Sequence, residues 1–151
     1  MYRKIVVPID LAHVDRMEGA IAMAADLAKL YGATVCYLGA TTPTPSSVAH
    51  TPEEYKQKLA DFAENEARAH GQDVTTHVIL SHDPTATLDD DLVKAVDEMG
   101  ADLVVMATHV PHIGDRIWAS NGGNLARRTK ASVCLVRATG EASARNNKTE
   151  Q

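Results

Sequence analysis

The side chains best suited to bind an anion lie in the last third of the chain, where Ser120 and Asn121 precede a helical segment. Ser and Asn are preferred at a helix start because their side chains accept hydrogen bonds from its free N–H groups. These N–H groups and the positive end of the helix dipole form a natural phosphate site. Arg116 is the nearest cation that could face a phosphate. The chemistry predicted for this loop is therefore the binding of a phosphorylated ligand.

A second group with chemical potential is Asp10, which follows the apolar segment of residues 4–9. Pro8 cannot donate a ladder hydrogen bond, so a strand here should end near it. Ligands of open parallel α/β sheets bind at the carboxyl ends of the strands, where both Asp10 and the phosphate loop are expected. Asp10 could contact a ligand there or cap the helix that follows, and the sequence leaves both roles open.

The other histidines and carboxylates give weaker indications of a functional site. His109, His112 and Asp115 could suggest a metal, but their loose spacing in a loop with a proline favours ordinary hydrogen-bonded side chains. His77 falls in an alternating segment and is expected at the surface of a strand. The acidic run of residues 89–91 is expected in the first turn of a helix, where the dipole favours negative charge.

Apolar and amphipathic segments alternate along the chain and predict the elements that position these groups. Strands are predicted at residues 4–9, 34–39, 74–80, 103–106 and 132–136. Helices are predicted at about 17–31, 51–70 and 84–99, with a short one after Gly123. This order is typical of a Rossmann-like, doubly wound parallel sheet with right-handed crossovers.

Helix boundaries are also readable. Thr51 and Pro52 form a good helix start, and Glu54 can reach back in a capping box. Gly32 and Gly71 are expected to end their helices in the left-handed conformation. The polar loop from Thr41 to Thr51 is long for a compact domain, which makes it either a lid or a tether.

Composition places the chain among globular proteins. Its 151 residues predict one domain over residues 1–137, followed by a small, polar and disordered tail at 138–151. The net charge of −5 argues against nucleic acid or an anionic membrane as partner. No apolar run reaches the length of a membrane span, and the start does not read as a signal peptide. Cys36 and Cys134 lie in apolar segments and are predicted to be buried free thiols, which indicates a cytoplasmic protein.

The residues also carry a family pattern. The opening KIVVPID, the segment GADLVVMATH and the ending SVCLVR resemble the universal stress proteins over residues 1–137. The chain looks most like the subgroup with a His-x-Pro loop and a Gly-Ser-Asn turn, which appear here as HVP at 109–111 and ASN at 119–121. The resemblance implies an adenine-nucleotide-alpha-hydrolase-like fold with strand order 3-2-1-4-5. It also implies a homodimer that pairs the last strand, Ser132 to Arg137, across a twofold axis.

Many members of this family bind ATP, and the resemblance carries their site to this chain by position. The adenine and ribose positions fall on Pro8, Ile9, Asp10, Gly39 and Ala40. The phosphate-loop positions fall on Ala107, His109, Val110, Ala119, Ser120 and Asn121.

Three of the loop positions that are glycine in the family pattern are substituted here, by Ala107, Val110 and Ala119. Glycine is used where backbone approaches a phosphate or takes a positive φ, and a side chain in that conformation costs about 1–2 kcal/mol. Gly122 and Gly123 follow immediately and could supply backbone N–H groups.

Two functions of different classes therefore stay open. One is a stress-response regulatory protein that binds ATP or AMP, with Mg²⁺ arriving with ATP. The other is a dimeric interaction protein whose pocket is degenerate and empty. An enzyme is less favoured, since no nucleophile with a partnered base is recognisable. At most, Asp10 and His109 could polarise a water for slow ATP hydrolysis.

Overall fold

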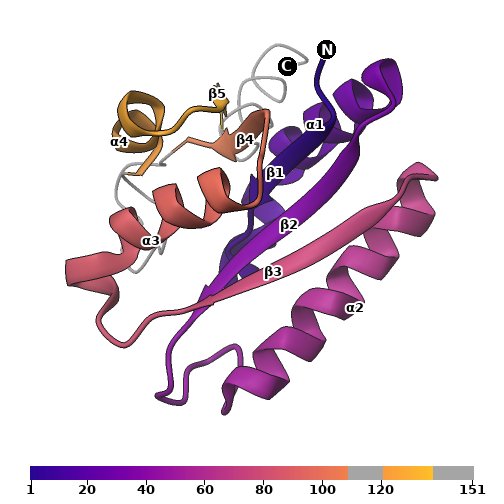
Figure 1. The fold of residues 1–151 in the computed structure, drawn as a ribbon. Coiled ribbons are helices and arrows are strands. Elements are labelled where there is room, and N and C mark those ends of the chain that lie inside the picture. The colour runs from indigo at the N-terminus through magenta and orange to yellow at the C-terminus, as the bar shows by residue number, and fades with distance from the viewer. Residues whose placement is uncertain (109–120, 138–151) are drawn as a thin grey trace, which may run out of the picture.

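Figure 1 shows the computed structural model of the chain, which describes residues 1–108 and 121–137. In chain order the elements are β1 (Lys4–Pro8), the 3-10 helix η1 (Leu11–Arg16), α1 (Glu18–Tyr31), β2 (Thr34–Thr41), α2 (Pro52–His70), β3 (Val74–Leu80), α3 (Pro84–Glu98), β4 (Leu103–Ala107), α4 (Asn121–Arg128) and β5 (Ser132–Val136). The predicted tail at 138–151 lies outside the described residues.

The strands form one five-stranded parallel sheet in the order β3-β2-β1-β4-β5, which confirms the predicted topology (Figure 1). The central strand β1 pairs with β2 on one side and with β4 on the other. Successive strands are therefore added on one side of β1, as β2 and β3, and then on its other side, as β4 and β5. Such a reversal leaves a crevice outside the carboxyl ends of the strands. Asp10 follows β1 at this point, and Thr108 follows β4.

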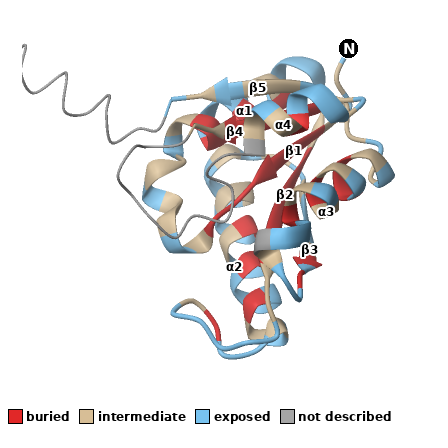
Figure 2. Cartoon of the chain, turned by 90° about the vertical axis from the view of Figure 1, so that its left-hand side faces the viewer, coloured by how far each residue is buried: buried red, intermediate tan, exposed pale blue. Residues whose placement is uncertain are grey.

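Helices cover both faces of the sheet. Side chains of α1 and α2 share one hydrophobic cluster with Ile5 and Val7 of β1. Side chains of α3 and α4 share a second cluster with Val6, because successive strand residues point to opposite faces. Figure 2 shows the resulting burial of β1 and β2 between the two layers. In the part of the chain that the structure describes, no helix is long and apolar enough to cross a membrane.

Local signals predicted the helix ends correctly. Thr51 caps α2, its Oγ1 accepting the N–H of Glu54 at 3.1 Å. Gly32 and Gly71 end α1 and α2 with φ of 66° and 61°, in the left-handed region. The Glu54 carboxylate reaches one residue further than a capping box requires, accepting the N–H of His50 at 3.1 Å.

Several elements near the carboxyl edge differ from prediction, among them β4, which ends at Ala107 and not at Met106. β1 ends at Pro8 and not at Ile9, although the Ile9 N–H still donates to the Leu38 carbonyl at 2.8 Å. β2 continues to Thr41, two residues beyond the predicted end, because β3 offers partners as far as Leu80. The 3-10 helix η1 was not predicted, since residues 11–16 carry no apolar periodicity.

The acidic run that begins at Asp89 was predicted in a first helical turn, and this is wrong. α3 already starts at Pro84, so the run lies in its second turn. Its carboxylates instead reach α4: Asp89 accepts from Asn124 Nδ2 at 3.0 Å, and Asp90 lies 2.7 Å from the Arg128 guanidinium. The run therefore ties α4 to α3.

Both cysteines are free within the described residues. Cys36 is buried, as predicted. Cys134 is partly exposed, against prediction, because β5 is an edge strand; its Sγ lies 3.5 Å from Sδ of Met23. Tyr31, the last residue of α1, is 37% exposed, and its ring lies edge-to-face against Tyr2.

Candidate functional site

A cavity of about 180 Å³ lies at the carboxyl edge of the sheet, beside the end of β1. Its walls come from the start of η1, the end of β2, the following loop and the first turns of α2. The lining residues are Asp10, Leu11, Ala12, Ala40, Thr41, Thr42, Ser46, Ser47, Val48 and Tyr55. The cavity is smaller than the ~300–1,000 Å³ usual for ligand sites, so it encloses only part of a nucleotide-sized molecule.

Asp10 supplies the charge of this cavity and is only 4% exposed. Its Oδ1 accepts the N–H of Ala12 at 3.1 Å, and its Oδ2 lies 2.9 Å from His13 Nδ1. The side chain therefore caps η1, one of the two roles left open by the sequence. A carboxylate has about four acceptor sites. These two contacts leave acceptor sites free for a hydrogen-bond donor on a ligand. Contact with a ligand, the second role, stays a prediction.

Tyr55 of α2 brings a second polar group to the cavity. The residue is 3% exposed, and its hydroxyl has no hydrogen-bond partner among the described residues. Burial raises the pKa of Tyr55 well above its usual range, the charge of Asp10 raises it further, and the Ala40 backbone opposes both. The phenol is therefore neutral near pH 7, with a proton to donate beside a buried carboxylate.

The ring of Tyr55 lies directly on Gly39 of β2. A Cβ atom at Gly39 would fall 2.6 Å from Tyr55 Oη and 2.8 Å from its Cε1. The missing side chain of Gly39 thus makes the space in which the ring sits. An isolated glycine inside a strand indicates such a close approach, a signal that was available in the sequence but was not linked to Tyr55.

The loop after β2 folds over the cavity, and Ser46 shapes it. Its Oγ accepts the N–H groups of Val48 and Ala49, both at 3.3 Å, and its own N–H donates to the Ala49 carbonyl at 2.8 Å. Ala49 is buried in the core cluster of α1 and α2. The loop carries Ser46, Ser47 and Val48 into the cavity wall and so forms a cover on one side of the cavity; its role as a lid or as a tether stays a prediction.

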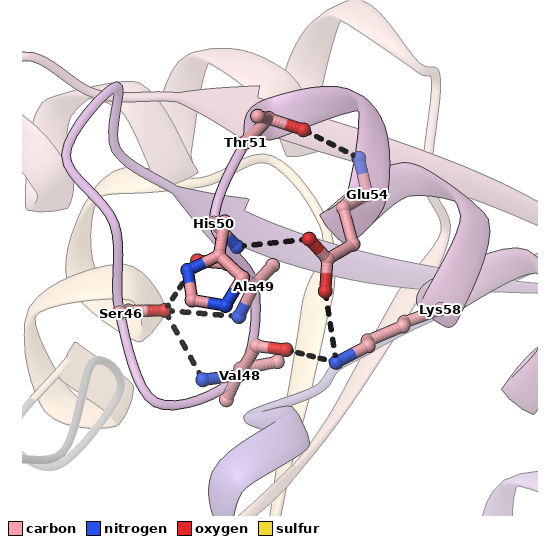
Figure 3. Close-up of polar contacts among 7 residues, drawn as sticks. All are labelled: Ser46, Val48, Ala49, His50, Thr51, Glu54 and Lys58. Atoms are coloured by element: carbon pink, nitrogen blue, oxygen red, sulfur yellow. Dashed lines mark hydrogen bonds and ion pairs between the residues drawn. The ribbon is translucent and has the colours of Figure 1, made fainter.

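Figure 3 shows how this cover is anchored to α2. Lys58 Nζ donates to the Val48 carbonyl and lies 3.3 Å from Glu54 Oε1. The other Glu54 oxygen accepts the His50 N–H. The His50 amide, followed by the ammonium of Lys58, holds the pKa of the Glu54 carboxyl below its usual range. The second half of this loop, at Val48 and His50, is therefore held by the first two turns of α2.

The sequence profile of the Universal stress protein family matches residues 1–137. The chain belongs to the universal stress protein family. Universal stress protein G of Shigella flexneri is 25% identical over 144 residues, which cover 91% of this chain and all of the relative.

Solved universal stress proteins have the same adenine-nucleotide-alpha-hydrolase-like fold. One from Archaeoglobus fulgidus has a TM-score of 0.64 at 24% identity, covering 89% of this chain and 98% of its own. Another, solved in complex with cAMP, has a TM-score of 0.62 at 27% identity, covering 91% and 98%.

The described part of this universal stress protein holds only some of the predicted site residues. Asp10 and Ala40 line the cavity. The predicted residues that do not line it are Pro8, Ile9, Gly39 and Ala107. His109, Val110, Ala119 and Ser120 lie outside the described residues, as do Arg116, His112 and Asp115. The phosphate half of the predicted site therefore stays a prediction.

Asn121 begins α4, so Gly122 and Gly123 lie inside the helix and not before it. A Cβ atom at Gly122 would fall 2.6 Å from Leu135 Cδ2. Gly122 thus leaves room for the side chain of Leu135 on β5. The sequence did not predict this packing role, because Gly122 was expected in the phosphate loop. Among the described residues there is no group of three His, Cys, Asp or Glu that could hold a metal, and His77 is exposed as predicted.

Proposed function

We propose that this universal stress protein binds an adenine nucleotide, with the nucleoside part in the cavity beside Asp10. The observation that carries the proposal is a buried carboxylate in a small cavity at the reversal point of strand order, where doubly wound sheets bind ligands. The structure of a 27% identical universal stress protein in complex with cAMP supports the ligand class.

The small cavity also supports an orientation for the ligand. About 180 Å³ leaves the phosphates outside the cover formed by Ser46 to Val48. They would extend toward β4, the residues that follow it and the start of α4, where helix N–H groups favour anions. ATP would bring Mg²⁺ with it. Of the three residues that replace glycines, Ala107 is the last residue of β4, a strand position that carries no cost of a left-handed backbone. If nucleotide binding requires a left-handed backbone at Val110 or Ala119, the cost of about 1–2 kcal/mol weakens affinity by roughly tenfold at each.

The test is calorimetric titration of purified protein with AMP and with ATP–Mg²⁺, together with mass spectrometry of the nucleotide released on denaturation. We expect heat that saturates in the micromolar to submillimolar range. An empty extract and no heat at millimolar nucleotide would overturn the proposal and favour the second candidate, an interaction protein with an unused pocket.

We also propose a homodimer formed through the last strand, from Ser132 to Arg137. β5 is an edge of the sheet, and Leu135 on it is 49% exposed. Unpaired apolar edge strands are generally covered in native proteins, and a twofold contact between identical strands would do so.

Leu135→Lys is expected to halve the molar mass measured by light scattering, because a charge would then face its copy across the axis. Leu30→Lys is the matched control, since Leu30 is 72% exposed and belongs to α1, not to the strand proposed to pair. A wild-type protein that sediments as a monomer at every concentration would exclude the dimer.

A further inference from the structure

The hydroxyl of Tyr55 is buried and has no hydrogen-bond partner among the described residues, although the Ala40 backbone lies close enough to lower the pKa of the phenol. A hydroxyl removed from water without a hydrogen bond destabilises a protein. Phenylalanine would fill the same space over Gly39 without that penalty. Tyr37 also has a buried hydroxyl without a partner in the described part of the chain, so burial alone does not indicate a ligand; Tyr55 is distinguished by its place in the cavity wall, where a ligand could supply the partner.

Tyr55 differs from Tyr37 in being one of the residues that line the cavity. Tyr55 and Asp10 line it together, and the charge of Asp10 acts on the phenol strongly enough to raise its pKa. The ionised carboxylate can only accept hydrogen bonds, whereas the neutral phenol can donate one. The two groups together are complementary to a donor and an acceptor placed side by side on one ligand.

We propose that Tyr55 is a specificity-determining residue: its hydroxyl donates a hydrogen bond to the nucleoside part of the ligand, beside a ligand donor that Asp10 accepts. This inference rests on the proposed nucleotide function. An adenine ring offers such a pair in its amino group and neighbouring ring nitrogen, and a ribose offers one in its two adjacent hydroxyls. Either pair presents the same chemistry to the protein.

Tyr37 supplies a matched control. Its hydroxyl is also buried without a partner among the described residues, and the ring is fully buried. Tyr37 does not line the cavity and packs edge-to-face on Phe62 at 5.2 Å. Tyr37→Phe and Tyr55→Phe thus remove the same buried group, but only one of them removes it from the cavity.

The experiment measures the affinity for AMP and the melting temperature of wild type, Tyr55→Phe and Tyr37→Phe. We expect Tyr55→Phe to bind AMP about tenfold more weakly, the usual effect of losing one hydrogen bond, and Tyr37→Phe to bind it as wild type does. Without ligand, both variants should melt at or above the wild-type temperature. A Tyr55→Phe variant that binds AMP as wild type does, or that melts well below it, overturns the inference.

Two further ligands identify the ligand atom that accepts the hydrogen bond from Tyr55. Inosine monophosphate exchanges the donor and acceptor of the base edge, and 2′-deoxy-AMP lacks one sugar hydroxyl. Loss of the wild-type preference for AMP over either analogue in Tyr55→Phe supports the inference and names the atom. If wild type binds none of these nucleotides, the proposed function fails as well; if wild type binds and Tyr55→Phe is unchanged, only the role of Tyr55 fails.

Discussion

Gly39→Ala is expected to destabilise the protein by about 1–3 kcal/mol, the usual effect of forcing an extra methyl group into a packed core. The new Cβ would lie 2.6 Å from Tyr55 Oη, 2.8 Å from Tyr55 Cε1 and 3.1 Å from Leu59 Cδ2. Tyr55 and Leu59 are at most 3% exposed, so the ring can relieve the contact only by shifting into the small cavity that it lines. The melting temperature should fall by roughly 3–10 °C.

Two variants make this result specific. Gly123→Ala adds the same methyl group to an exposed helix position with nothing within 4 Å, and should leave stability equal or raise it by about 0.5–1 kcal/mol. In a Tyr55→Ala background the ring is gone, so Gly39→Ala should lose most of its effect. The coupling between the two positions is measured by denaturant unfolding of wild type, Gly39→Ala, Tyr55→Ala and the double variant. Additive effects would show that the ring does not rest on Gly39.

The fold was predictable because its signals are local. Thr51 and Pro52 mark the start of α2 whatever surrounds them, and Gly32 and Gly71 end helices by their own backbone freedom. The alternation of strand and helix then leaves few parallel arrangements. What failed was set by distant partners. β2 runs to Thr41 because β3 pairs with it as far as Leu80. A short stretch of sequence around Gly39 does not contain that partner strand.

The candidate site was predictable only in part, for the same reason. Asp10 could be assigned because any residue directly after the central strand reaches the carboxyl edge of the sheet. Tyr55 follows the apolar period of α2, and that period correctly predicts its burial. The period cannot show that the hydroxyl and ring edge of Tyr55 pack on Gly39, nor that the residue also lines a cavity with Asp10. Both features depend on contacts between residues from three separate elements.

Asp10→Ala is expected to lower nucleotide affinity by about 10- to 100-fold, because a hydrogen bond to a charged group contributes about 1.5–3 kcal/mol. The same change leaves the Ala12 N–H without its acceptor, and loss of such a cap costs about 0.5–2 kcal/mol of stability. Binding and folding should therefore both weaken, as measured by calorimetry and by thermal unfolding.

Asp10→Asn separates these two roles, since asparagine caps helices about as well as aspartate does. Its stability should stay close to wild type, while its affinity falls nearly as far as in Asp10→Ala because the charged acceptor is gone. Asp26→Asn removes the same charge from an exposed position of α1 and should change neither quantity. If Asp10→Asn instead binds nucleotide as tightly as wild type, Asp10 serves only to cap η1. The carboxylate would then be a structural group that happens to line a cavity.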